Sequence, residues 1–262
     1  MPREIVYDVN LLLLFLVSIG ALILFTELGF HLGRLSGRGT SEKARSQIGT
    51  IQAAILGLLA LLLGFTFSMA MSRYEARRQL VVDEANAIGT TYLRGQLLPE
   101  PQHEEIVDLL RRYIQVRLDF YAADTDTKKL EAANQATNKL QLQLWSIAAA
   151  LGAKEPRAVT VGLFLQSLNE VIDLHNKRLH ELENHVPEII LFLLYFVALV
   201  ATGLIGYGCG LGGVRNFFVT VVSSILIAAV IIVIIDLDRP VHGLIQVSQQ
   251  RMLELRHSLK DK

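Results

Sequence analysis

A set of small, apolar and polar side chains recurs at helical spacing in one apolar stretch of the chain. Since successive residues of a helix are rotated by about 100°, seven of these residues share one face. The side chains on this face are small or apolar at its N-terminal end and polar towards its C-terminal end. They are Gly57, Leu61, Phe65, Ser68, Ser72, Glu75 and Gln79. Such a face suits the wall of an ion pore with one hydrophobic constriction. Because Gly and Ser also permit close packing in a helix bundle, the pattern leaves both interpretations open.

Three histidines offer possible metal ligands, but their spacing is unsuitable. His175, His180 and His185 recur every five residues. Ligands of one metal on a helix need a spacing of three or four residues, whereas five residues turn them to different faces. The single cysteine, Cys209, excludes a disulfide framework and a cysteine-rich zinc site. We therefore expect no metal site, and histidines that are solvated or lie between helices.

Two other patterns could suggest a nucleotide site or catalysis. The string Gly208 to Gly213 matches G-x-G-x-x-G, but it follows an apolar helix and lacks the required βαβ context. We expect these glycines, together with Gly203 and Gly206 before them, to serve close helix packing and a tight turn. The acidic pairs Asp83-Glu84 and Glu104-Glu105 stand in charge-balanced helical sequence and indicate solvated faces. No triad or nucleophile elbow is recognisable, so we expect no catalytic residues, no cofactor and no enzymatic activity.

The overall composition is that of a membrane protein. The net charge is zero, with 25 Lys and Arg against 25 Asp and Glu, which leaves no basic excess for a nucleic-acid partner. Apolar residues make up 52% of the chain and charged residues only 19%. This is fewer charges than a soluble domain usually carries, and the apolar content excludes disorder.

The charges are segregated, and four stretches are almost free of them. Each has about the 20 residues that a helix needs to cross a bilayer, and only the first holds an ionisable residue, Glu27. The N-terminus lacks a basic region and a clear cleavage site, so the first stretch is expected to be retained rather than removed as a signal peptide. The predicted spans are 10–30, 48–71, 189–211 and 217–235.

These spans divide the chain into two hairpins around a charged middle, which carries 14 Lys and Arg and 16 Asp and Glu. The predicted parts are a first transmembrane hairpin (1–71), a helical extramembrane domain (72–186), a second transmembrane hairpin (187–236) and a C-terminal tail (237–262). The fold class is therefore an all-α membrane protein with four transmembrane helices and a helical extramembrane domain.

The middle is predicted to be helical throughout. Without an internal proline, the second span can continue as one helix until Pro99. An amphipathic pattern with Ile106, Leu110 and Tyr113 on one stripe indicates the next helix. An Asp124-Thr125-Asp126 turn should cap the third, Gly152 should close it, and Pro156 should open the fourth. The expected helices are 47–98, 102–123, 127–151 and 157–185.

Three short stretches resemble motifs of the bestrophins. Leu63-Gly64-Phe65 followed by Ser72-Arg73-Tyr74 is similar to their pore helix. Phe164 to Glu170, Phe-Leu-Gln-Ser-Leu-Asn-Glu, resembles the helix that leads into their third span. Asp238 to Gly243, Asp-Arg-Pro-Val-His-Gly, stands where they have N-P-F-G after the fourth span. The chain most resembles the bacterial bestrophin-like domain proteins.

The resemblance implies a homo-oligomeric channel for monovalent ions in a lipid bilayer, a pentamer in which each second span lines one axial pore. The neck implied by the family falls on Gly57, Leu61 and Phe65. Gly57 replaces a bulky residue there, so the constriction would depend on Leu61 and Phe65, with Met69. The pore-lining residues that follow are Ser68, Met69, Ser72, Glu75 and Gln79.

Charge selectivity stays open. The resemblance implies chloride or other anions, whereas a ring of Glu75 carboxylates would favour cations. Arg73 and Arg77 lie off the pore stripe, so we expect them to contact other subunits or lipid headgroups. The tail from Leu244 has no acid before Glu254, so calcium gating through that segment is not expected.

The resemblance places the protein in a bacterial inner membrane, with the termini and the helical domain in the cytoplasm. Basic residues lean only slightly toward this orientation, because the first hairpin loop holds four of its own, Arg34, Arg38, Lys43 and Arg45. The alternative function is a non-conducting membrane scaffold or sensor whose helical domain binds a partner protein.

Overall fold

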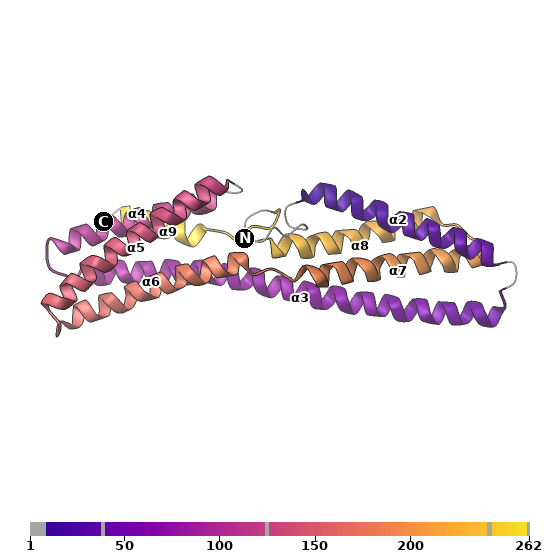
Figure 1. Ribbon diagram of the computed structural model, residues 1–262, viewed down its shortest axis with the longest axis horizontal. Coiled ribbons are helices and arrows are strands. Elements are labelled where there is room, and N and C mark those ends of the chain that lie inside the picture. Colours follow the sequence, from indigo (N-terminus) through magenta and orange to yellow (C-terminus); the bar gives the residue numbers. More distant parts are fainter. Residues whose placement is uncertain (1–8, 38–39, 124–125, 240–242, 261–262) are drawn as a thin grey trace. The chain divides into compact units, whose positions relative to one another are not determined.

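The computed structural model describes residues 9–37, 40–123, 126–239 and 243–260, and all regular structure within these ranges is helical (Figure 1). The chain forms two compact units. The first combines Met1–Ser72 with His185–Arg239, and the second combines Arg73–Asn184 with Pro240–Lys262. One helix, α3 (Glu42–Gly95), contributes to both. The predicted all-α class is confirmed.

The first unit holds the four apolar helices. They are α2 (Leu11–Ser36), the N-terminal part of α3, α7 (Glu188–Gly212) and α8 (Phe217–Asp238). Each is long and apolar enough to cross a membrane and includes one predicted span. The Asn10 side chain caps α2 by accepting the Leu12 N–H at 2.9 Å, and α2 continues past the predicted end of the span at Phe30. Gly213, with φ of 67°, ends α7 in the left-handed conformation that favours glycine.

Helices α2 and α7 pack backbone to backbone. A Cβ added at Gly29 would lie 1.9 Å from the carbonyl oxygen of Gly203, and one added at Gly206 would lie 1.9 Å from that of Thr26. Only a hydrogen atom fits at these positions. At four positions a side chain larger than that of glycine would clash with the backbone of the facing helix, namely Gly29, Gly33, Gly206 and Gly210. The packing role predicted for the α7 glycines is thus confirmed at Gly206 and Gly210, whereas the matching α2 glycines were not foreseen.

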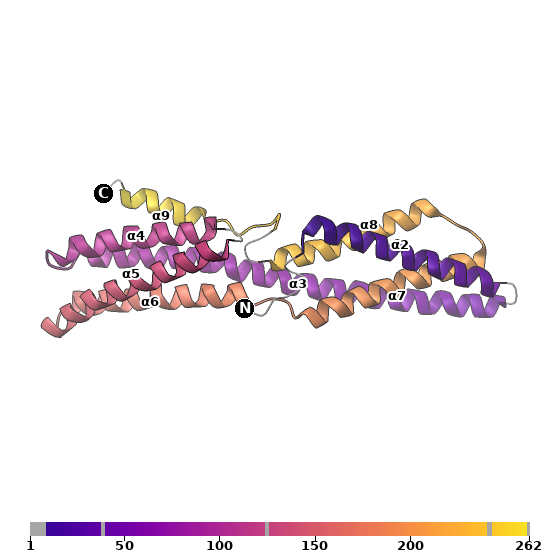
Figure 2. The same cartoon turned by 45° about the horizontal axis from the view of Figure 1, so that its top comes forward.

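The second unit holds the rest of α3 and four further helices. They are α4 (Gln102–Ala122), α5 (Thr127–Lys154), α6 (Val159–Glu183) and α9 (Gln250–Lys260), all visible in Figure 2. The helices predicted in the middle are confirmed with small shifts. Gly152 lies inside α5 rather than closing it, because it does not adopt the positive φ of a glycine cap and the helix continues to Lys154. Helix α9 was not predicted in the tail.

Asp126 caps α5 as predicted, since its side chain accepts the N–H groups of Lys128 and Lys129 at 3.2 Å each. The other two residues of that predicted turn, Asp124 and Thr125, lie outside the described residues.

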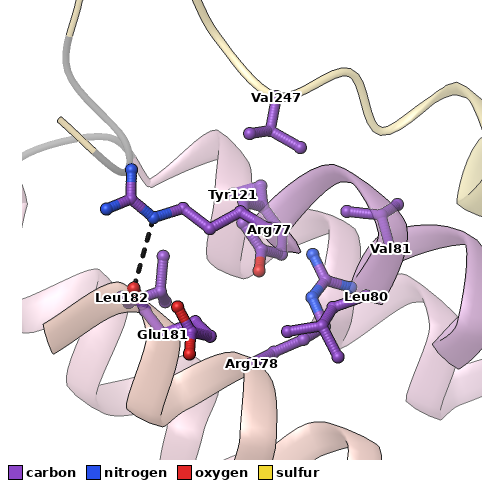
Figure 3. Close-up of a pocket in the computed structure, with 8 residues that line it drawn as sticks. All are labelled: Arg77, Leu80, Val81, Tyr121, Arg178, Glu181, Leu182 and Val247. Carbon is purple, nitrogen blue, oxygen red and sulfur yellow. Dashed lines mark hydrogen bonds between the residues drawn. The ribbon is translucent and has the colours of Figure 1, made fainter. Parts of the chain in front are cut away.

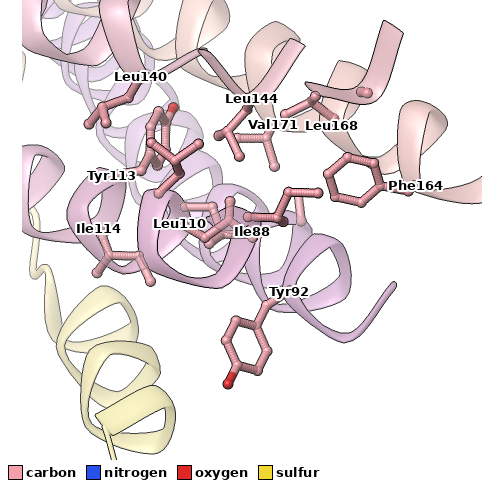
Figure 4. Close-up of a cluster of buried hydrophobic side chains, with 14 of the residues drawn as sticks. Ile88, Tyr92, Leu110, Tyr113, Ile114, Leu140, Leu144, Phe164, Leu168 and Val171 are labelled. Atoms are coloured by element: carbon pink, nitrogen blue, oxygen red, sulfur yellow. The ribbon is translucent and has the colours of Figure 1, made fainter. Parts of the chain in front are cut away.

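A single apolar core fills the second unit (Figure 4). The predicted stripe of α4 supplies Ile106, Leu110 and Tyr113, each fully buried. Helix α3 adds Ile88 and Tyr92, and Figure 4 shows that α5 and α6 contribute from the other sides. Their buried residues are Leu140, Leu144, Phe164, Leu168 and Val171. Burial of this apolar surface stabilises the four-helix arrangement.

Candidate functional site

The membrane part of α3 exposes the face predicted to line a pore. Leu61 is 55% and Phe65 66% exposed, while Leu59, Thr66 and Ala70 are buried in the first unit. All predicted neck and lining residues of this part are exposed, namely Gly57, Leu61, Phe65, Ser68, Met69 and Ser72. The chain itself therefore leaves this face open to an outside contact.

Exposure extends to other faces of the same segment. Phe67 is 41% and Leu58 47% exposed, as expected of a helix that also contacts lipid. The pore roles of Leu61, Phe65 and the lining residues stay predictions.

A polar contact attaches helix α3 to α7 in the first unit. The Gln52 side-chain amide donates to the Leu204 carbonyl oxygen at 3.0 Å. Gly208 leaves the space for this side chain, because a Cβ there would lie 3.0 Å from Gln52 Oε1. In a bilayer an interhelical hydrogen bond of this kind fixes the rotation of one helix against another.

The two predicted lining residues of the second unit, Glu75 and Gln79, are also exposed. Arg78 lies one turn beyond Glu75 and donates to its carboxylate at 3.3 Å, with side chains 61% and 50% exposed. Gln79 donates to Asp83 at 2.9 Å. The negative charge of Glu75 is therefore accompanied by a positive charge in the same chain, although an exposed pair of this kind is weak.

Arg73 and Arg77 both contact their own chain. The burial of Arg77 argues against the predicted contact with other subunits or headgroups, whereas for the half-buried Arg73 that contact stays a prediction. Arg73 donates to the Asn184 side chain. Arg77 is 5% exposed and donates to the carbonyl oxygens of Glu181 and Asn184 at 3.2 and 3.0 Å. The last carbonyls of a helix lack intrahelical donors and favour a nearby cation, which explains why the end of α6 holds Arg77.

A small pocket adjoins Arg77 in the second unit (Figure 3). The side chains of Leu80, Tyr121 and Val247 line it together with Arg178. Its volume of about 10 Å³ is the space of roughly one water molecule. This pocket is therefore too small for an organic substrate.

A buried ion cluster lies at the centre of the second unit. Glu84 of α3 accepts hydrogen bonds from Arg117 Nε of α4 at 2.9 Å and from Arg178 of α6. Their side chains are 0%, 1% and 3% exposed. Tyr113 donates to Glu84 at 3.4 Å and accepts from Gln141 of α5 at 3.2 Å. One network thus connects four helices.

The cluster is electrostatically coupled. Burial would raise the pKa of Glu84, but the charges and hydrogen bonds of Arg117 and Arg178 outweigh it and hold the pKa below its usual value. Burial, and the Glu84 charge next, raise the pKa of Tyr113. Two guanidinium groups face one carboxylate, and the Tyr121 ring lies 4.4 Å from the Arg178 guanidinium, a cation–π contact that stabilises the excess positive charge.

His175 of α6 lies beside this cluster and is fully buried. Within the described part of the chain, neither ring nitrogen has a hydrogen-bond partner. Burial, with the charge of Arg117 second, lowers the pKa of His175 to about 4, so the ring is neutral at pH 7. His180 is exposed, so the two histidines do not share a surface.

The sequence reasoning missed this cluster, and its expectation of a solvated face is wrong for Glu84. The signal was present in the spacing, because Val81, Glu84, Ile88 and Tyr92 repeat at three or four residues and all are buried. Arg117 likewise continues the buried stripe of Tyr113 and Ile114. Charged residues are rarely buried without partners, and the sequence around Glu84 shows no partner near it, so a solvated position is the ordinary expectation for this residue.

The motif after the fourth span is described only in part. Asp238 is buried, and its carboxylate accepts the Val186 N–H at 2.6 Å. Pro240, Val241 and His242 of the predicted motif lie outside the described residues.

Comparisons with known proteins agree on one family. A family model described as Bestrophin-like domain matches residues 19–252. A search of curated proteins gave no match.

The solved structures that match include a bacterial bestrophin homologue from Klebsiella pneumoniae, with a TM-score of 0.65, 16% identity and coverage of 96% of this chain and 98% of that one. A single-substitution variant of that homologue matches with a TM-score of 0.69, 16% identity and coverage of 97% and 98%. At this identity the likeness establishes the fold.

Proposed function

Since the chain belongs to the bestrophin-like family, we propose that several copies of it assemble around an axis and that the exposed face of α3 lines the resulting pore. Bestrophins are known as anion channels, which supports an ion channel at the family level. The apolar helices and the family together make this an integral membrane protein.

The observation that carries the proposal is the exposure of Leu61 and Phe65 on a helix that buries Leu59, Thr66 and Ala70 within its own unit. A face left open by one chain can line a pore once further copies enclose it. A ring of leucine and phenylalanine side chains disfavours water, so it forms a barrier to ions that dewetting closes. Gly57, Ser68, Met69 and Ser72 would line the pore on either side of this neck.

We propose that the assembly is a homo-oligomer, a pentamer as the family resemblance implies, and that it conducts monovalent ions. The family supports anion conduction, and Glu75 is the residue that would bias the pore toward cations. We place the protein in a bacterial inner membrane with the helical domain in the cytoplasm, and the bacterial origin of the matching structures supports the choice of membrane.

The test is the current through purified protein in planar bilayers. Phe65→Ala should raise the current severalfold, because a smaller side chain weakens the hydrophobic barrier. Phe67→Ala is the matched control, because Phe67 is exposed on a different face of the same helix. If neither the wild type nor Phe65→Ala conducts, or if Phe67→Ala has the same effect as Phe65→Ala, the proposed pore face is wrong.

A non-conducting scaffold or sensor is the second candidate, and one observation favours it. The second unit exposes large apolar side chains that a partner protein could cover, namely Leu93, Leu97, Leu142, Trp145 and Val159. Particle images by electron microscopy distinguish the two functions. A ring with α3 around a central opening supports the channel, and particles without such an opening support the scaffold.

A further inference from the structure

A cavity lined by three arginines lies between helices α4 and α9 of the second unit. Its volume is about 200 Å³. Arg111 and Arg112 come from α4, and Arg256 comes from α9. The remaining lining residues are Ile114, Gln115 and Leu259. We propose that this cavity binds a phosphate-bearing anion.

The arginines have more donors than partners. Arg111 donates from Nε to the Leu259 carbonyl oxygen at 2.9 Å. Arg256 donates from one terminal nitrogen to Gln115 at 3.3 Å, and its buried Nε has no partner within the described part of the chain. Each guanidinium group carries five N–H donors. Most of the donors at this cavity are therefore available to an added acceptor.

Neighbouring acids compensate little of this charge, and among the described residues no carboxylate lines the cavity. Asp108 approaches Arg112 at 3.7 Å, and both side chains are more than half exposed. Asp119 accepts from the Gln115 side chain at 2.8 Å. On α9, Glu254 pairs with Arg251 at 3.0 Å. The potential in the cavity is therefore positive, which attracts an anion.

The donor geometry favours phosphate. The planar fork of arginine matches two phosphate oxygens at once, and several arginines together suit a multiply charged group. None of the described residues that line the cavity is aromatic, so none of them would stack on a base. The phosphate group itself is the recognised part, whether it belongs to a soluble phosphate compound or to a lipid headgroup. Because the cavity lies between α4 and α9, the bound anion would join the two helices.

The experiment measures binding to the full-length protein in detergent. Sodium pyrophosphate is titrated by calorimetry at constant ionic strength, and a second arm measures binding of short-chain phosphatidic acid, with phosphatidylcholine as its neutral reference. We expect saturable binding of at least one of the two probes. Arg256→Gln should weaken it about tenfold, the effect of one lost charge-assisted hydrogen bond.

Two further variants separate a site from general surface charge and from misfolding. Arg112→Gln should also weaken binding, and it leaves the fold intact because the Arg112 side chain is 59% exposed with only a long contact to Asp108. Arg251→Gln, on the same helix as Arg256 but outside the cavity, should bind as the wild type does.

Binding of pyrophosphate would identify a soluble ligand, and binding of phosphatidic acid alone would identify a lipid headgroup. Absence of saturable binding for both probes overturns the proposal. So does an equal loss in Arg251→Gln and in Arg112→Gln, which would show a general charge effect.

Discussion

Arg178 of α6 and Glu84 of α3 form an ion pair in which the two side chains are only 3% and 0% exposed. Arg117 of α4 shares the same carboxylate at 2.9 Å. Removing one member of a buried ion group leaves the others without compensation, which destabilises more strongly than the intact group stabilises. The carboxylate is therefore the member whose loss should matter most.

Glu84→Gln should lower the free energy of unfolding by about 3 to 5 kcal/mol, because two buried guanidinium groups then face no charge of opposite sign. Chemical denaturation of the purified protein, followed by circular dichroism, measures this. Asp83→Asn is the matched control, since Asp83 is a neighbouring acid whose partner is the exposed Gln79. Equal effects of the two substitutions would contradict a special role for the buried cluster.

His175 should make the stability fall in acid. Its pKa is about 4 in the folded chain, against 6.5 for the ordinary side chain, so the unfolded state binds more protons below pH 6.5. The stability linked to this neutral histidine is present above pH 6.5 and is lost progressively as the pH falls from 6.5 to 4. The loss amounts to about 3 kcal/mol.

His175→Leu should remove this part of the pH dependence, because leucine cannot take up a proton. His180→Leu, at an exposed position, should leave it unchanged. Melting temperatures between pH 7.5 and 4 give the comparison. A His175→Leu profile parallel to that of the wild type would show that this histidine does not control the acid sensitivity.

Gly29→Ala should destabilise the first unit by about 2 to 3 kcal/mol, because the new Cβ would lie 1.9 Å from the Gly203 carbonyl oxygen. Gly20→Ala in the same helix is the control, since its Cβ would have no neighbour within 4 Å. Thermal unfolding in detergent measures both. A melting temperature of Gly29→Ala equal to that of Gly20→Ala would mean that α2 and α7 do not depend on this close approach.

Glu75 and Arg78 should shift ion selectivity in opposite directions, a prediction that depends on the proposed channel. Glu75→Gln removes a negative charge near the proposed pore and should move the reversal potential in a salt gradient toward that of anions. Arg78→Gln frees the Glu75 carboxylate from its partner at 3.3 Å and should move the potential toward that of cations. Shifts of the same sign in both variants would count against a pore lined by Glu75.

The sequence by itself determined the apolar helices and the faces they expose. A run of about 20 uncharged apolar residues is typical of a membrane-spanning helix. The helical period placed Leu61 and Phe65 on one face regardless of their neighbours. The stripe of Ile106, Leu110 and Tyr113 was equally readable, because apolar periodicity states which side of a helix is buried. These features depend on residues within one helix.

Only the tertiary structure decided the partners of the charged residues. Glu84 and Arg178 are 94 residues apart, and the carboxylate becomes buried only because α4 and α6 bring guanidinium groups to it. Arg77 likewise donates to the end of α6, and Gly29 packs against the backbone of α7. Helical periodicity gives a direction for each side chain and carries no information about which distant helix it meets, so pairing of charges and close backbone contacts appear only when the helices pack.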